Sequence, residues 1–326
     1  MSPLRHLLLA ALCGLALLLR PLPAGAQATA SAPAASAPTG AAADARRPLL
    51  WQVRHGDQVL YLLGSFHLLT PEDAPLPAET ERAFAAAQTV VFEIAPAEMD
   101  APDAAARAQA YMGYADPGLH LSAVLPAATR ERLQTLVAAS GGSLQALEPL
   151  EPWAVNLGLV LGVTQQLGFR ADLGLDRQLM ARAAAAGKPT AGLESLDAQM
   201  QALDAAPLDE QVRALDEFVQ DPRKAVQQVQ ELHAWWRAGD VAALDAHMRE
   251  DLQRKSPQTY RLLDVQRNLA WLPQLEARLQ APGSGTTLVV VGALHLLGPD
   301  GLVELLRAKG YAVERVCDAC AAPGAP

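Results

Sequence analysis

The chain has 326 residues, of which 51% are hydrophobic and 19% are charged. A chain of this length and composition can bury a sizeable core, which excludes wholesale disorder and a small disulfide-stapled scaffold. The formal net charge is −9, whereas a nucleic-acid partner requires a basic face that displaces counterions from phosphates. We therefore expect no nucleic-acid partner, and one large domain or two small ones.

The first 26 residues are typical of a secretory signal peptide. A nearly unbroken apolar run from Leu7 to Leu19 is followed by Ala24-Gly25-Ala26, an A-x-A cleavage site. The run is short for a bilayer span, although Arg20 directly behind it could flank an uncleaved anchor. We therefore expect a periplasmic or secreted protein that contacts a membrane, if at all, only through an uncleaved signal.

The rest of the chain divides into a linker, one folded domain and a tail. Residues 27–45 are rich in Ala, Ser and Pro and contain no large apolar side chain, as in a flexible linker. Residues 46–316 are expected to form a single folded domain, and residues 317–326 a short tail. No window after the signal is long and apolar enough to predict a membrane span.

The tail carries a C-x-x-C pair, Cys317 and Cys320. In an oxidising compartment such a pair can close a small disulfide, which is the interpretation we favour. Two free thiols, a redox site and a metal site are the alternatives. A thioredoxin-like role would place the pair at a helix N-terminus within a βαβ unit, and this tail offers no such context.

The folded region combines short strands with long helical segments. In chain order we predict a hairpin of strands at Leu49–Arg54 and Gln58–Leu63, a helix at Ala78–Ala87, a strand at Thr89–Phe92 ending on Glu93, a mainly helical insertion at about 99–186, a strand at Lys188–Leu193 ending on Glu194, a second helical segment at about 195–279, a strand at Thr286–Val291, a helix at Gly301–Lys309 and a last strand at Tyr311–Val316. This order predicts an α/β (α+β) fold with a central mixed β-sheet, flanking helices and a large helical insertion.

Four of these strands lead to polar side chains that make one candidate site. His67 and His295 each complete a G-x-x-H sequence behind a strand, and Glu93 and Glu194 end two others. In open α/β sheets ligands lie beyond the carboxyl ends of the strands, so these side chains could meet there. Two imidazoles and two carboxylates suit a divalent transition metal such as Mn, Co or Zn. Structural histidines, solvated carboxylates and, for Glu194, a helix N-cap partner are the simpler alternatives.

Arg267 and Asn268 are a further candidate pair in the helical segment before the last buried strand. They could anchor a carboxylate or another substrate anion, but an ion pair on the surface is the simpler interpretation and the one that the sequence alone slightly favours. Ser65 follows a strand but lacks the flanking glycines of a G-x-S-x-G elbow, so a serine hydrolase fits poorly.

The order of these motifs resembles the TraB/PrgY/GumN family over about Leu49 to Val316. The matching stretches are Gly64–His67, Val91–Glu93, Gly192–Leu196, Arg267-Asn268, Val291–Gly301 and Gly310–Val313. The resemblance implies a fold related to erythromycin-esterase-like and ChaN-like domains, and an activity like that of the Tiki-type metal-dependent proteases. It also implies that a metal is held by His67, Glu93 and His295, and that catalysis is supported by Glu93, Glu194, Arg267 and Asn268.

Three hypotheses on function follow. The first is an exported metal-dependent hydrolase, specifically a peptidase, in which metal-bound water attacks a carbonyl and Glu93 or Glu194 handles the proton. The second is a non-catalytic periplasmic binding protein for a peptide, a haem-like ligand or a polysaccharide-related ligand. The third is a structural or assembly role in the export of a surface polymer. Neither the substrate, the identity of the metal nor the oligomeric state follows from the sequence.

Overall fold

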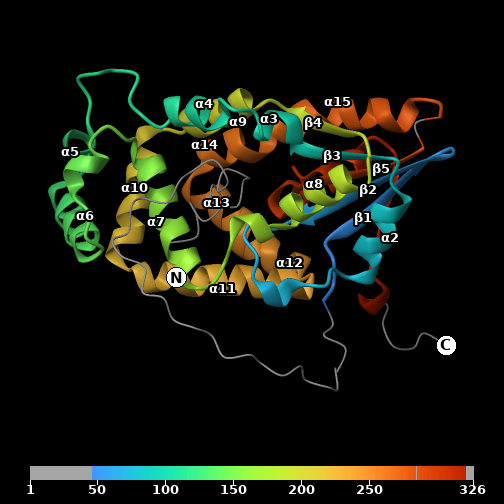
Figure 1. The fold of residues 1–326 in the computed structure, drawn as a ribbon, viewed down its shortest axis with the longest axis horizontal. Helices are drawn as coiled ribbons and strands as arrows, with labels where there is room; N and C mark the ends of the chain where they lie inside the picture. Colours follow the sequence, from blue (N-terminus) through green and yellow to red (C-terminus); the bar gives the residue numbers. More distant parts are fainter. Residues whose placement is uncertain (1–45, 284, 321–326) are drawn as a thin grey trace.

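The computed structural model describes residues 46–283 and 285–320. The expected signal peptide, its cleavage site and the linker fall within residues 1–45, outside this range, so they stay predictions. The described residues form a six-stranded mixed sheet with many helices around it (Figure 1). The expected α/β fold class is therefore confirmed.

The sheet has the strand order β4-β3-β5-β2-β1-β6. The bounds are β1 Leu50–His55, β2 Gln58–Ser65, β3 Thr89–Ile94, β4 Thr190–Glu194, β5 Thr286–Gly292 and β6 Ala312–Arg315. Strands β4, β3, β5 and β2 run parallel to one another, and β1 runs antiparallel to both of its neighbours. The carboxyl ends of four parallel strands therefore meet at one edge of the sheet, although long helical segments separate them in the sequence.

Strands β2 and β3 extend two residues further than the apolar runs that predict them. β2 continues to Ser65, which pairs with Gly292 of β5, and β3 continues to Ile94, which pairs with Glu194 of β4. Glu93 therefore lies inside a strand and not behind it. The pairing with neighbouring strands carries β2 and β3 beyond their apolar runs, and a local sequence pattern does not record such tertiary pairing.

The middle of the sheet is also the middle of the hydrophobic core. In β5 every residue from Leu288 to Val291 is at most 1% exposed. Parallel strands that are covered on both faces are continuous apolar runs of this kind, which is why the sequence predicts β5 well. Burial of one such side chain contributes about 1.5–3 kcal/mol. The run therefore fixes the end of β5 and, with it, the turn that carries His295.

Helices make up most of the remaining chain. Their bounds are α2 Ala78–Ala86, α3 Pro96–Met99, α4 Ala104–Ala110, α5 Leu121–Val124, α6 Ala127–Ala139, α7 Pro152–Gln166, α8 Leu175–Ala185, α9 Leu196–Asp204, α10 Leu208–Gln220, α11 Pro222–Ala238, α12 Val241–Leu244, α13 Glu250–Lys255, α14 Pro257–Tyr260, α15 Gln266–Gln280 and α16 Leu302–Ala308. In the part of the chain that the structure describes, none of them is both long and apolar enough to span a bilayer.

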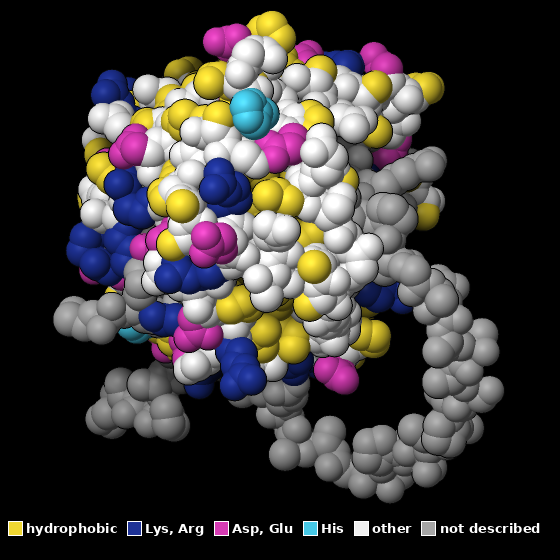
Figure 2. Space-filling model, turned by 90° about the vertical axis from the view of Figure 1, so that its left-hand side faces the viewer, with side chains coloured by type: hydrophobic (Ala, Val, Ile, Leu, Met, Phe, Trp, Pro, Cys, Tyr) yellow, Lys and Arg dark blue, Asp and Glu magenta, His cyan; other side chains and the backbone are white. Residues whose placement is uncertain are grey.

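The two predicted helical segments are divided into many short helices, and prolines mark several of the starts. Pro152, Pro222 and Pro257 lie in the first turns of α7, α11 and α14, where a missing backbone N–H costs no helical hydrogen bond. In Figure 1, α5, α6, α7 and α10 lie to the left, away from the sheet on the right. The face at that end carries basic and acidic side chains interspersed with scattered hydrophobic ones, so neither sign of charge dominates it (Figure 2).

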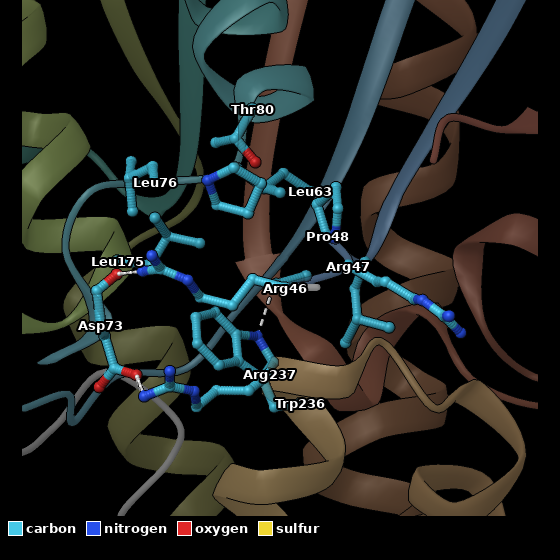
Figure 3. A pocket seen from close by; sticks show the side chains of 13 residues that line it. Arg46, Arg47, Pro48, Leu63, Asp73, Leu76, Thr80, Leu175, Trp236 and Arg237 are labelled. Atoms are coloured by element: carbon cyan, nitrogen blue, oxygen red, sulfur yellow. Dashed lines mark hydrogen bonds and ion pairs between the residues drawn. The ribbon is translucent and has the colours of Figure 1, made fainter. Parts of the chain in front are cut away.

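Helix α11 is fixed to the loop behind β2 through a buried acidic side chain, Asp73. Asp73 accepts a hydrogen bond from Arg237 Nη1 at 3.0 Å (Figure 3). It also accepts one from His233 Nε2 at 3.0 Å. Burial would raise the pKa of Asp73, but its hydrogen bonds, first of all that from His233, outweigh burial and lower the pKa. In the same pocket Trp236 donates to the carbonyl oxygen of Gly64 at 3.0 Å. α11 therefore holds the strand end from which the first G-x-x-H sequence departs.

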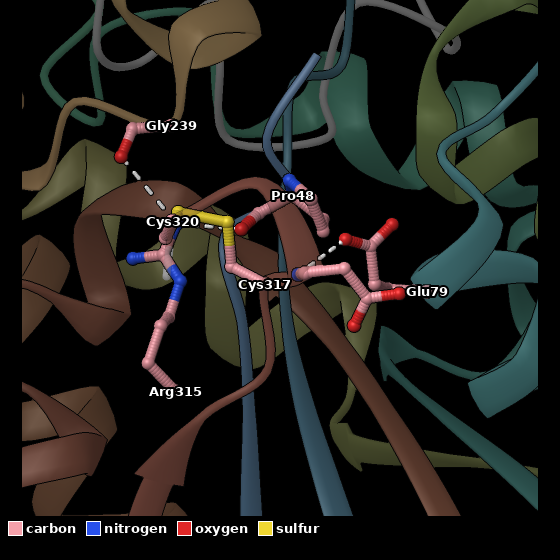
Figure 4. Close-up of a disulfide and its surroundings, with 7 residues drawn as sticks. Pro48, Glu79, Gly239, Arg315, Cys317 and Cys320 are labelled. Carbon is pink, nitrogen blue, oxygen red and sulfur yellow. Dashed lines mark hydrogen bonds between the residues drawn. A yellow bond between two sulfur atoms is a disulfide. The ribbon is translucent and has the colours of Figure 1, made fainter. Parts of the chain in front are cut away.

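The C-terminal tail contains a disulfide between Cys317 and Cys320, as the C-x-x-C spacing predicts (Figure 4). Between the two cysteines, the backbone N–H of Asp318 donates to Glu79 Oε1 of α2 at 2.8 Å. These contacts fix the tail to the folded domain and support the structural interpretation of the pair.

Candidate active site

The carboxyl edge of the parallel strands gathers the side chains that the sequence analysis singles out. His67 lies behind β2, Glu93 in β3, Glu194 at the end of β4, His295 in the single turn behind β5, and Arg267 and Asn268 in the first turn of α15. Hydrogen bonds join five of these six residues into one network, and His67 lies beside it.

Glu93 is a buried carboxylate with three hydrogen-bond donors around it. Its Oε1 accepts the backbone N–H of Gly292 at 2.6 Å, and its Oε2 accepts Arg267 Nη2 at 2.6 Å and Gln199 Nε2 at 3.0 Å. Burial would raise the pKa of Glu93, but the positive charge of Arg267 and the Gly292 hydrogen bond are among the causes that lower it to about 2. Glu93 is therefore ionised near neutral pH and is a weak base.

Arg267 links Glu93 to the second glutamate. Its Nη2 lies 2.6 Å and its Nε 3.0 Å from Glu194 Oε1, while Trp271 donates to Glu194 Oε2 at 3.2 Å. The guanidinium also lies over the Trp271 ring, 4.7 Å from its centroid. One cation thus binds two carboxylates through charge-assisted hydrogen bonds.

The sequence slightly favours an ion pair on the surface at Arg267 and Asn268, and this prediction is wrong. The two residues are 5% and 0% exposed. A π-helical turn at Arg261–Val265 leads directly into α15. Such a turn holds an extra residue and so changes the face on which later side chains lie. A regular α-helical periodicity across the segment therefore assigns Arg267 and Asn268 to the wrong face of the helix.

His295 is fully buried and has both ring nitrogens engaged. Nδ1 lies 2.8 Å from the amide oxygen of Asn268 and 3.1 Å from Asp264 Oδ1. Because the Asn268 oxygen can only accept, Nδ1 carries the hydrogen. Nε2 then accepts Arg267 Nη1 at 3.1 Å. His295 therefore positions Arg267 and has no nitrogen left for a substrate in this arrangement.

His67 differs from His295 because one of its nitrogens is unengaged. Its Nδ1 lies 2.9 Å from Asp176 Oδ1, whereas its buried Nε2 has no hydrogen-bond partner among the residues that the structure describes. Burial would lower the pKa of His67, but the charge and hydrogen bond of Asp176 outweigh burial and raise it. A Cβ at Gly174 would lie 2.2 Å from the His67 carbonyl oxygen, so only glycine lets α8 bring Asp176 this close.

A small cavity separates His67 from Glu93. Its volume of about 20 Å³ has room for one water molecule or one ion. A Cβ at Gly292 would lie 3.2 Å from His67 Nε2 and 3.3 Å from Glu93 Oε1, so the glycine keeps this space open. The lining residues are His67, Phe92, Glu93, Ile94, Met99, Asp176, Met180, Gln199 and Val290.

The arrangement does not fit a metal ion held jointly by His67, Glu93 and His295. Arg267 donates to Glu93 Oε2 and to His295 Nε2, two of the atoms that an ion would take, and a guanidinium keeps its charge. Across residues 46–283 and 285–320, no three His, Cys, Asp or Glu side chains lie close enough to share an ion. Metal binding by these residues stays a prediction, and it requires Arg267 to move.

Comparison with known proteins identifies the family of the chain and two proteins similar to it. The pattern that defines the TraB/PrgY/gumN family matches residues 49–315. The chain belongs to this family. The chain is also similar to proteins of Escherichia coli (strain K12) and Shigella flexneri, both named "Uncharacterized protein YbaP". Each is 29% identical over 257 residues, which cover 77% of this chain and 89% of the relative. No solved structure matches the chain.

The sequence does not predict three buried side chains of the candidate active site, which are Asp176, Gln199 and Asp264. Asp176 has a weak signal, because it stands two positions behind a glycine, in the first turn of what is helix α8 in the structure. Asp264 stands three residues before Arg267, within reach on a helix. Gln199 has no signal, since it is one of several polar residues in its helix.

Proposed function

We propose that this chain is an exported hydrolase of the peptidase type in which His67 is the general base. The observation that carries the proposal is the buried Nε2 of His67, which has no hydrogen-bond partner in residues 46–283 and 285–320. His67 lines a water-sized cavity, while Asp176 engages the other ring nitrogen. A carboxylate that orients an imidazole in this way is typical of hydrolytic sites. Export is supported by the signal-like residues 1–26.

In the proposed reaction, His67 takes a proton from water at Nε2 while the water oxygen forms a bond to the carbonyl carbon. When the C–N bond of the amide breaks, the same proton passes to the leaving nitrogen. We assign this proton to His67 in place of Glu93 or Glu194. The low pKa of Glu93 makes it a weak base, and both oxygens of Glu194 accept hydrogen bonds from Arg267 or Trp271.

Arg267 and Asn268 have positioning roles in this proposal. Arg267 holds both glutamates and His295, and Asn268 fixes the His295 ring. Through Arg267, these hydrogen bonds hold Glu93, which lines the cavity together with His67. Neither Arg267 nor Asn268 takes part directly in proton transfer. This differs from the catalytic roles that the family resemblance implies for the two residues.

Metal dependence, which the resemblance implies, is tested by chelation. Because Arg267 engages Glu93 and His295, we expect hydrolysis to persist after exhaustive treatment with EDTA. Activity and metal content are measured on the same preparation, before and after addition of Mn, Co or Zn. The metal-dependent form of the peptidase would instead be supported if activity disappeared on chelation and returned when one ion bound per chain. In that case His67→Ala and His295→Ala should show neither the activity nor the bound ion.

The hydrolase itself is tested with a pooled library of internally quenched peptides and the chain without residues 1–26. We expect cleavage by the wild type, and a loss of about 10²–10⁴-fold in His67→Gln, the typical contribution of a general base. His120→Gln is the matched control, because His120 is exposed and lies outside the site. Peptides that the wild type retains but leaves intact would favour the periplasmic binding protein over the enzyme.

A further inference from the structure

Gln199 is a buried residue of the cavity to which no motif assigns a role. It lies on α9 (Leu196–Asp204) and is 1% exposed. Its Nε2 donates to Glu93 Oε2 at 3.0 Å, while its Oε1 has no hydrogen-bond partner within the described part of the chain. A buried amide oxygen without a donor costs free energy, so its retention calls for a ligand that supplies a hydrogen.

The orientation of the Gln199 amide follows from its neighbour. Glu93 Oε2 also accepts a hydrogen bond from Arg267 Nη2, so this oxygen is an acceptor and has no hydrogen to donate. The NH₂ group of Gln199 must therefore face Glu93, and the opposite orientation would set two acceptors against each other. Oε1 is thus held on the other side of the amide as a fixed acceptor.

His67 supplies a second acceptor to the same cavity. Since Nδ1 of the neutral ring donates to Asp176, Nε2 keeps a lone pair, and both His67 and Gln199 line the cavity. A cavity of about 20 Å³ holds about one water molecule. Water has two hydrogens to donate, which match the two acceptors, and its own lone pairs then point away from both of them.

We propose that Gln199 positions the attacking water by accepting one of its hydrogens at Oε1 while His67 Nε2 accepts the other. This rests on the proposed function for the reaction, but the water site itself does not. The proton on the His67 side is the one that His67 removes during attack. Gln199 keeps its hydrogen bond throughout and neither gains nor loses a proton. Gln199 therefore orients the oxygen of the attacking water, and other residues bind the peptide.

The water site is tested by high-resolution crystallography of the mature chain in EDTA. We expect an ordered oxygen at roughly 2.6–3.2 Å, hydrogen-bonding distance, from both His67 Nε2 and Gln199 Oε1. In Gln199→Met, which keeps the length of the side chain, this oxygen should shift or disappear. Gln201→Met on the same helix is the matched control, because Gln201 is exposed. An oxygen unchanged in Gln199→Met, no oxygen near both atoms, or an ion in its place overturns the assignment.

Kinetics on the peptides that the wild type cleaves give the second readout. Gln199→Met should lower kcat about 100-fold, the usual effect of misplacing a reacting group, with KM unchanged. A rise in KM with kcat unchanged would make Gln199 a substrate-binding residue and overturn the proposal. If the wild type cleaves no peptide, the proposed function fails, whereas the crystal structures still decide the water site. Gln199→Asn, which keeps the amide on a shorter side chain, repeats the crystallographic test if the methionine variant does not fold.

Discussion

Replacing Arg267 with methionine is expected to lower the free energy of unfolding by about 3–5 kcal/mol, the usual cost of breaking a buried ion pair by removing one partner. The side chains of Glu93 and Glu194 are only 8% and 9% exposed, and Arg267 donates to both. Without the guanidinium, two carboxylates stay buried next to each other, and His295 Nε2 loses its donor.

Urea denaturation of the purified variants measures this loss. Arg213→Met is the matched control, because Arg213 pairs with Asp209 on an exposed helix face, and such pairs contribute little. A triple variant with Arg267→Met, Glu93→Gln and Glu194→Gln should recover most of the stability, since it leaves no uncompensated charge. An Arg267→Met chain as stable as the wild type would show that water reaches the glutamates and that the network is not closed.

Replacing Asp176 with asparagine is expected to lower kcat by about 10²–10⁴-fold with little change in KM. Asparagine has nearly the same shape, but its NH₂ group can donate to His67 Nδ1. The ring would then carry its hydrogen on Nε2, where the proposed mechanism needs a lone pair. The expected effect therefore comes from the tautomer of His67 and not from a lost packing contact.

The hydrolysis assay and nitrogen NMR of the imidazole ring test this effect together. The wild type should show the hydrogen of the neutral ring on Nδ1, and Asp176→Asn should move it to Nε2. Asp172→Asn serves as the control, because Asp172 forms an exposed ion pair in the same region of the chain. A slow Asp176→Asn variant with the wild-type tautomer would argue that Asp176 acts through structure alone.

The sequence predicts the framework of the site well, because a short local signal marks each part of it. The apolar run before Gly292 indicates a strand covered on both faces, and the glycine and histidine behind it repeat the pattern at Gly64 and His67. Parallel strands place such sequences at one edge, whatever length of chain lies between them. The grouping of His67, Glu93 and His295 therefore follows from topology.

The partners of those residues are much harder to predict. Asp176 and Gln199 belong to helices, where a polar residue is ordinary, and only the tertiary packing of α8 and α9 turns them toward the strand ends. The burial of Arg267 depends on two carboxylates that are distant in the sequence. Charged residues are rarely buried unless they are paired, so without knowledge of the partners the surface is the natural prediction.

Strands carry the two G-x-x-H sequences, whereas helices supply their partners, and this matters when a function is transferred from one relative to another. The helical insertion between β3 and β4 supplies Asp176, and the segment between β4 and β5 supplies Gln199 and Arg267. A relative that kept both G-x-x-H sequences but carried other side chains at positions 176 and 199 would retain the signature and lose the arrangement around His67. The helical positions, more than the two motifs, are therefore the ones to compare before an activity is assigned to another chain.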